Sequence, residues 1–124
     1  MMTANSDTLI FVYGTLKRGF CRAHNLQGQT FLSTAKTTAE YTMYNCGTYP
    51  GLVRNNGDGI SIQGELWRVD HRALKLLDEV EGVAENLYQR GPIQLIQPQV
   101  TETVEAYFYQ RPVNQMPVIG DNWC

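Results

Sequence analysis

The sequence predicts a mixed α/β (α+β) fold in which a small mixed sheet closes partly into a β-barrel, with one main helix beside it. Short segments rich in β-branched and aromatic residues alternate with turn signals along most of the chain. One further segment repeats apolar residues at helical spacing. The chain has 124 residues, of which 43% are hydrophobic and 18% charged, so residues 1–124 are expected to form a single domain.

The extended segments are expected at residues 8–13, 31–44, 60–69, 87–96 and 104–109. The first is typical of a buried strand, and the second of one long bent strand that "CGTYPGLV" then breaks. The composition of "NNGDG", residues 55–59, predicts a hairpin turn before the third segment. Pro92 indicates an edge strand or a bulge, and the tail from residue 111 is expected to be loop.

The helix is expected between these strands, in "HRALKLLDEVE". Asp70 is a good N-cap, and Gly82 is a typical residue at which a helix stops. At 100° per residue, Glu81 borders the apolar face, whereas Asp78 and Glu79 rotate toward water.

Glu81 is the candidate catalytic residue. Burial disfavours its charged form, and so does the negative end of the helix dipole. Both effects raise the carboxyl pKa from about 4.3 toward neutrality, where a carboxylate can accept and return protons. Acids at helix ends are also common for purely structural reasons, and Glu65 is the alternative acid beside a motif.

Composition and charge argue against several classes of partner and cofactor. The net charge is −2 with scattered cations, which argues against nucleic acid, and no apolar run is long enough for a membrane span. "MMTANSD" lacks the basic start of a signal peptide, so a cytoplasmic location is expected. No cofactor or metal site is expected from Cys21, Cys46, Cys124, His24 and His71, although Cys21 beside His24 leaves a cysteine nucleophile open.

In the stretch "IFVYGTLKRG", an apolar segment expected to be a strand is followed by a glycine and then by two cationic residues. Such an ending is either an ordinary turn or a loop whose backbone amides capture an anion. The sequence lacks the glycine pattern of nucleotide-binding loops.

Five short motifs occur together in the order "VYGTLKRG", "YPGLV", "GELWRVD", "LLDEVEG" and "YQR". This set resembles the γ-glutamylcyclotransferase-like family, in particular its γ-glutamylamine cyclotransferase and butirosin-deprotecting branch. The resemblance implies the family's small barrel with a cavity. It also implies an enzyme that releases 5-oxoproline and a free amine from a small γ-glutamyl amine or γ-glutamyl-protected intermediate.

By matching position, the resemblance implies that Glu81 moves the proton. It implies that the γ-glutamyl group is gripped by the loop Tyr13, Gly14, Thr15 and Leu16, and it places the family's Tyr-x-Arg on Tyr88 and Arg90. Tyr88 is accordingly a candidate substrate-binding residue.

Arg22 and Ala23 stand where relatives often have Asn and His, which leaves the recognised amine open. A non-catalytic module that binds a small ligand or a partner protein is the alternative function. A plain barrel with a structural Tyr13 and Glu81 is a third reading. The oligomeric state is also left open.

Overall fold

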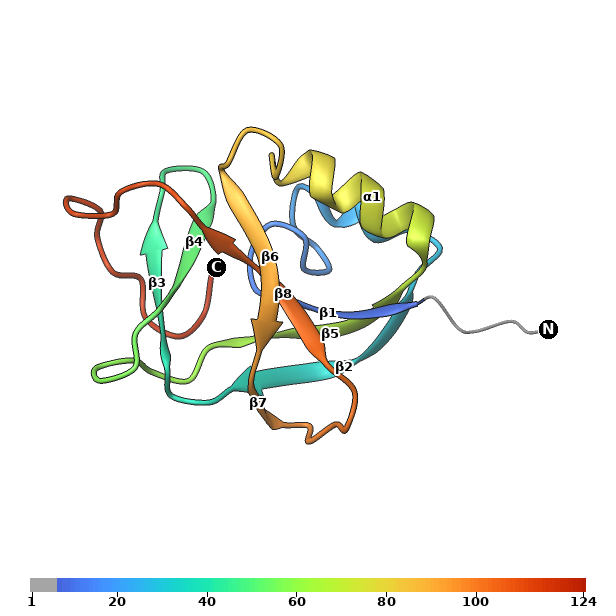
Figure 1. Ribbon diagram of the computed structural model, residues 1–124, viewed down its shortest axis with the longest axis horizontal. Helices are drawn as coiled ribbons and strands as arrows, with labels where there is room; N and C mark the ends of the chain where they lie inside the picture. Colours follow the sequence, from blue (N-terminus) through green and yellow to red (C-terminus); the bar gives the residue numbers. More distant parts are fainter. Residues whose placement is uncertain (1–6) are drawn as a thin grey trace.

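The computed structural model describes residues 7–124, which form eight strands and two helices (Figure 1). The strands are β1 (Thr8–Val12), β2 (Thr30–Thr37), β3 (Tyr41–Asn45), β4 (Pro50–Arg54), β5 (Gln63–Val69), β6 (Tyr88–Ile93), β7 (Leu95–Gln97) and β8 (Val104–Tyr109). The helices are the short 3₁₀ helix η1 (Ala23–Leu26) and α1 (His71–Val80).

Six strands form one mixed sheet in the order β6-β8-β1-β5-β2-β7, and β3 and β4 pair separately. In the large sheet, β1 runs parallel to β8, and the neighbouring pairs that involve the other strands are antiparallel. In Figure 1, α1 lies along one side of this sheet, and the β3-β4 pair stands at the end away from the start of β1.

The large sheet curls because its two edge strands are consecutive in the chain. β6 ends at Ile93 and β7 begins at Leu95, so Gln94 alone separates strands at opposite edges. The Gln94 carbonyl accepts a hydrogen bond of 3.0 Å from the amide of Thr38, the residue after β2. The sheet therefore closes partly into a barrel, and the predicted fold class is confirmed.

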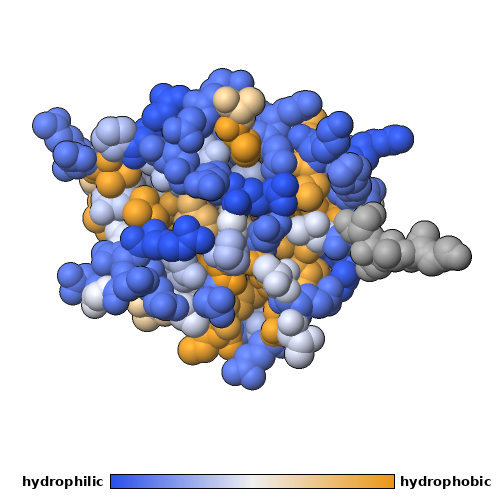
Figure 2. Space-filling model, viewed as in Figure 1, coloured by the Kyte–Doolittle hydropathy of each residue, from blue (hydrophilic) through white to orange (hydrophobic). Residues whose placement is uncertain are grey.

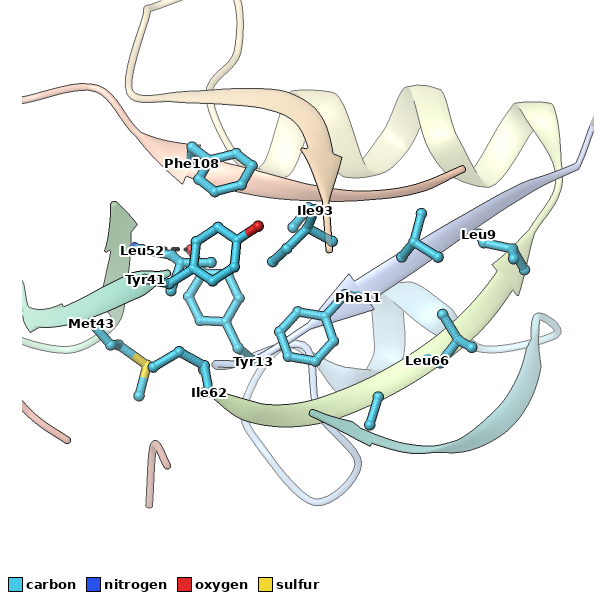
Figure 3. Packing of buried hydrophobic residues seen from close by; sticks show 13 residues of the cluster. Leu9, Phe11, Tyr13, Tyr41, Met43, Leu52, Ile62, Leu66, Ile93 and Phe108 are labelled. Atoms are coloured by element: carbon cyan, nitrogen blue, oxygen red, sulfur yellow. Dashed lines mark hydrogen bonds between the residues drawn. The ribbon is translucent and has the colours of Figure 1, made fainter. Parts of the chain in front are cut away.

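Alternate residues of the first strand and its end contribute to two hydrophobic cores. Leu9, Phe11 and Tyr13 belong to the core inside the curl of the sheet, where Figure 3 shows the rings of Phe11 and Tyr13 among the buried side chains. Ile10 and Val12 belong to the second core, on the side of the sheet that α1 covers. The helix contributes its buried residues to this second core, namely Ala73, Leu74 and Leu77.

The ends of α1 agree with the sequence prediction. The Asp70 carboxylate accepts a hydrogen bond of 2.8 Å from the Ala73 amide, as an N-cap does. Glu81 is the C-cap, and Gly82 follows with a φ of +64°, a left-handed conformation that glycine adopts easily. Glu81 is thereby fixed at the point where the helix stops.

The prediction of one long strand at residues 31–44 is wrong. This segment forms two strands, β2 in the large sheet and β3 in the small sheet. The chain leaves the large sheet after Thr37, whose hydroxyl oxygen accepts a hydrogen bond of 2.9 Å from the Ile62 amide. Within "CGTYPGLV", the residues of β4 form a strand rather than a break. The turn at 55–59 joins strands of different sheets, so it is not a hairpin turn.

The other strand predictions differ from the structure in detail. β5 begins at Gln63 rather than at residue 60, and Ile60 forms an isolated bridge with Tyr41. Pro92 lies in β6, which is an edge strand, as predicted. The tail packs along β3 through bonds from the Asn45 amide to the Pro117 carbonyl and from the Ile119 amide to the Met43 carbonyl.

Hydrophilic residues cover most of the face shown in Figure 2, with apolar areas between them. The exposed large hydrophobic residues belong to several elements and loops: Leu32, Ile60, Leu76, Ile96, Val100 and Val118. Among the helices of residues 7–124, none is long and apolar enough to cross a lipid bilayer.

Gly64 allows β5 to pack closely against the end of β1. A Cβ atom at Gly64 would lie 2.4 Å from the Val12 carbonyl oxygen and 2.6 Å from Cζ of Phe11. We expect Gly64→Ala to lower the free energy of unfolding by about 1–3 kcal/mol through overpacking, as measured by urea denaturation. A Cβ at Gly57 meets open space, so Gly57→Ala should change the free energy of unfolding by less than about 0.5 kcal/mol. Equal stability of the two variants would contradict this account of the strand contact.

Candidate active site

A cleft next to the end of β1 is lined by all six residues that the sequence singled out for binding and catalysis: Tyr13, Gly14, Thr15, Leu16, Glu81 and Tyr88. About 350 Å³ of space lies between its lining residues, and this volume includes the open solvent at its mouth. The same cleft is lined by Phe11, Val12, Arg22, Tyr49, Pro50 and Tyr107. The structure thus brings the predicted residues together, while their chemical roles stay predictions.

The Tyr13 hydroxyl connects the first motif to two strands that are distant in the sequence. It donates a hydrogen bond of 2.6 Å to the Tyr107 carbonyl in β8 and accepts one of 3.3 Å from the Leu52 amide in β4. Burial raises the pKa of Tyr13 well above its ordinary value, so the group stays protonated and continues to donate. Its bonds fix where the loop begins.

Gly14 allows the first motif to touch the second. A Cβ atom on Gly14 would lie 2.6 Å from Cγ of Pro50, the first residue of β4. The Tyr88 hydroxyl donates a hydrogen bond of 2.6 Å to the Pro50 carbonyl, which holds the same proline from the side of β6. The glycine is therefore required by a close approach between two chain segments.

The loop after Gly14 is a tight turn with unused backbone donors. The Lys17 amide donates to the Gly14 carbonyl at 3.0 Å, and the Arg22 amide donates to the Thr15 carbonyl at 2.9 Å. Within residues 7–124, the amides of Gly14, Thr15 and Leu16 donate to no protein acceptor. The ordinary turn and the anion-binding loop are thus compatible readings of the same segment.

Glu81 is the carboxylate that lines the cleft; the described residues contribute no other acid to its lining. The Glu81 amide donates to the Leu77 carbonyl at 2.9 Å, so its backbone belongs to the last turn of α1. Burial raises the pKa of its carboxyl group from 4.5 to about 7, and the positive charge of Arg22 opposes that rise. The predicted raised pKa is supported, with burial as its main cause.

The prediction that Asp78 turns toward water holds only in part, because its side chain is 28% exposed but also binds polar partners. Glu79 is exposed as predicted, but the Asp78 carboxylate accepts hydrogen bonds from the Tyr107 hydroxyl at 2.7 Å and from Nε of Arg90 at 3.0 Å. A helical wheel does not show that β6 and β8 supply polar partners at this end of α1. Asp78 lies almost one turn before Glu81 and ties that turn to the sheet.

The two residues of the Tyr-x-Arg motif lie in different places, one in the cleft and one outside it. Tyr88 lines the cleft, whereas Arg90 lies outside its lining and pairs with Asp78 and with Glu105, the latter at 2.7 Å. These side chains are between one quarter and one third exposed, so solvent screens the ion pairs and limits their contribution to stability. Their effect on the site is to position Asp78 and the end of α1.

The alternative candidates lie outside the cleft. The Glu65 carboxylate is buried and accepts three hydrogen bonds of 3.1 Å, two from Arg18 and one from the Trp67 indole, so its role is structural. Cys21 and His24 are both exposed and do not line the cleft. In residues 7–124, no three His, Cys, Asp or Glu side chains cluster closely enough to hold a metal ion.

Besides Phe11 and Val12 of the predicted first strand, four lining residues had no role assigned from the sequence: Arg22, Tyr49, Pro50 and Tyr107. Tyr49 and Pro50 belong to "YPGLV", so their motif was visible although its contact with the first loop was not. Arg22 was visible as a departure from the family pattern. No signal in the sequence indicated Tyr107, because its position depends on how β8 packs beside β1.

Comparison with known proteins identifies the family of this chain. The family model described as "Gamma-glutamyl cyclotransferase, AIG2-like" matches residues 10–124. The chain therefore belongs to the AIG2-like γ-glutamylcyclotransferase family, as its motifs indicated.

Relatives and a solved structure show the same family. A Vibrio cholerae protein, named provisionally as a γ-glutamylcyclotransferase, is 35% identical over 116 residues, which cover 94% of this chain and 95% of that protein. γ-Glutamylaminecyclotransferase A of Danio rerio is 39% identical over 93 residues, 69% of this chain, but the match spans only 57% of the zebrafish protein. The crystal structure of an AIG2-like protein of Mus musculus superposes with a TM-score of 0.75 at 25% identity, covering 93% of this chain and 87% of that one.

The raised pKa of Glu81 makes a prediction about stability and pH. Between pH 4.5 and about 7 the folded protein holds a proton that the unfolded chain has lost, so stability from this group falls as pH rises through that window. A glutamine at this position cannot ionise, so the variant does not lose this stability as the pH rises. We therefore expect Glu81→Gln to unfold at a higher temperature than the wild type at pH 8, and at a similar temperature at pH 4. Thermal denaturation followed by circular dichroism measures both; an equal shift at the two pH values would contradict the assignment.

Proposed function

We propose that this protein is an enzyme that releases 5-oxoproline and a free amine from γ-glutamyl compounds. One observation carries the proposal: a partly buried carboxyl group with a pKa of about 7, Glu81, shares a cleft with a loop of unused backbone amides. The family match and the names of the relatives support γ-glutamylcyclotransferase activity in general. The 5-oxoproline product and the role of a single glutamate are our proposal.

The substrate supplies its own nucleophile in this reaction. The α-amino nitrogen forms a bond to the γ-carbonyl carbon, and the bond from that carbon to the departing nitrogen breaks. Two protons leave the α-nitrogen and two reach the departing nitrogen, so no oxidant, reductant or water is consumed. Holding the glutamyl chain in its folded conformation removes much of the entropic barrier to ring closure.

Glu81 has the properties that this proton traffic requires. Its carboxylate accepts a proton from the α-ammonium group, and the resulting carboxylic acid protonates the departing nitrogen. A pKa of about 7 makes both transfers accessible near neutral pH.

The loop supplies the complementary anion site. The amides of Gly14, Thr15 and Leu16 hold the glutamyl α-carboxylate or the negative charge that develops on the γ-carbonyl oxygen. Burial raises the pKa of Tyr88 and of Tyr107 as well as that of Tyr13, so these neighbouring hydroxyls stay protonated and cannot compete with Glu81 as bases.

Incubation with a panel of γ-glutamyl amines and γ-glutamyl amino acids tests the proposal, with 5-oxoproline detected by mass spectrometry. We expect 5-oxoproline from at least one member, in equal amount to the released amine. If no member of the panel gives product, the alternative of a binding module with the family cavity is favoured, and calorimetry with 5-oxoproline then measures that binding.

Glu81→Gln separates proton transfer from binding. The amide keeps the shape of the carboxylate but can neither accept nor return a proton, so kcat should fall by about a hundredfold or more in steady-state assays. In the wild type, kcat/KM should rise with pH through about 7 as Glu81 ionises.

Glu79→Gln is the matched control, because Glu79 is exposed on the same helix. Its kcat should stay within a few fold of the wild type. Equal activity of the two variants on a confirmed γ-glutamyl substrate would show that Glu81 is not the acid/base group.

A further inference from the structure

Arg22 is the cationic side chain in the lining of the cleft, within the described residues, and it faces a cleft that contains one carboxylate. Its charge reaches Glu81 and favours the ionised carboxylate, although no ion pair within 4.0 Å joins the two side chains. The cleft thus holds one positive and one negative group that interact through their charges without forming an ion pair.

The backbone of Arg22 is held firmly while its guanidinium group is not. The Arg22 amide donates to the Thr15 carbonyl at 2.9 Å, inside the first motif. The Arg22 carbonyl accepts bonds of 3.1 Å from both the amide and the side-chain Nδ2 of Asn25. By contrast, the described residues supply no hydrogen bond or ion pair to the guanidinium, whose donors are therefore left for a ligand.

We propose that Arg22 selects the leaving group by pairing with a carboxylate on the carbon that bears the departing nitrogen. The inference rests on the proposed function, and it gives the substrate class as γ-glutamyl-α-amino acids in preference to γ-glutamyl derivatives of simple amines. Arginine suits this task because its planar fork matches the two oxygens of a carboxylate.

The chemistry of the reaction places such a carboxylate near both groups. Glu81 must reach the departing nitrogen to protonate it, and in an α-amino acid the carboxylate carbon is two bonds from that nitrogen. Without a neighbouring cation, this carboxylate would be repelled by ionised Glu81. Arg22 lies where it can relieve the repulsion, while the free amides of the loop serve the carboxylate at the glutamyl end.

Two substrates that differ by one carboxylate test the proposal. γ-Glutamyl-alanine and γ-glutamyl-ethylamine release alanine and ethylamine, and ethylamine is alanine without its carboxylate. We expect Arg22→Gln to lower kcat/KM for γ-glutamyl-alanine by about tenfold to a hundredfold, the loss of a charge-assisted pair. For γ-glutamyl-ethylamine the change should be less than about threefold.

Two further variants complete the measurement. Lys75→Gln removes one positive charge from an exposed position of α1 outside the cleft. It should leave kcat/KM unchanged for both substrates. Arg22→Lys keeps the charge but loses the planar fork of the guanidinium. Its kcat/KM for γ-glutamyl-alanine should therefore lie between those of the wild type and Arg22→Gln. If Arg22→Gln does not fold by circular dichroism, the lysine variant carries the test.

The outcomes separate the inference from the function on which it rests. Equal losses with both substrates would mean that Arg22 serves the glutamyl end, and unchanged kinetics would mean that it serves neither; each result overturns the inference and leaves the proposed function standing. If the folded wild type forms 5-oxoproline from neither substrate and from no member of the wider panel, the proposed function fails and this inference fails with it.

Discussion

The paired hydrogen bonds of the buried Tyr13 hydroxyl are the interaction on which the rest of the site depends. One bond reaches β8 and the other β4, so a single side chain joins the end of β1 to both sheets. The loop that follows can then touch Pro50, and Pro50 is in turn held by the Tyr88 hydroxyl. Because this hydroxyl is buried, losing it would leave the Leu52 amide without this acceptor, at a cost of about 1–3 kcal/mol for a buried unpaired group.

The wall of the cleft that carries Glu81 combines a carboxyl group whose charged form is disfavoured with a helix turn that is held in place. Burial of Glu81 favours its neutral form and costs stability above neutral pH. The cost is tolerated because the preceding turn of α1 is anchored by Asp78 to Tyr107 and Arg90. Tyr107 thus contributes its carbonyl to Tyr13 and its hydroxyl to Asp78, so one residue of β8 positions both walls.

The sequence predicted what depends on local periodicity. The inward lean of Glu81 follows from the helical repeat of 3.6 residues, and the cap at Asp70 follows from the type of residue that precedes this repeat. Both agree with the structure. The sequence failed where the outcome depends on strand exchange between sheets: residues 31–44 divide between two sheets, and β4 pairs where a break was expected. The partners of Asp78 were missed for the same reason, because they belong to strands that the wheel does not contain. Arg22 was noticed only as a departure, since its place in the cleft follows from how the loop folds back to let the Arg22 amide bond to the Thr15 carbonyl.

The central claim is that Glu81 holds a proton near neutral pH inside the cleft. Titration of its side-chain carboxyl by carbon-13 NMR measures this directly, with the signal assigned by its disappearance in Glu81→Gln. The predicted midpoint is about pH 7. A midpoint at or below 4.5, the ordinary value for an exposed glutamate, would contradict the claim and remove Glu81 as the group that exchanges protons with the substrate.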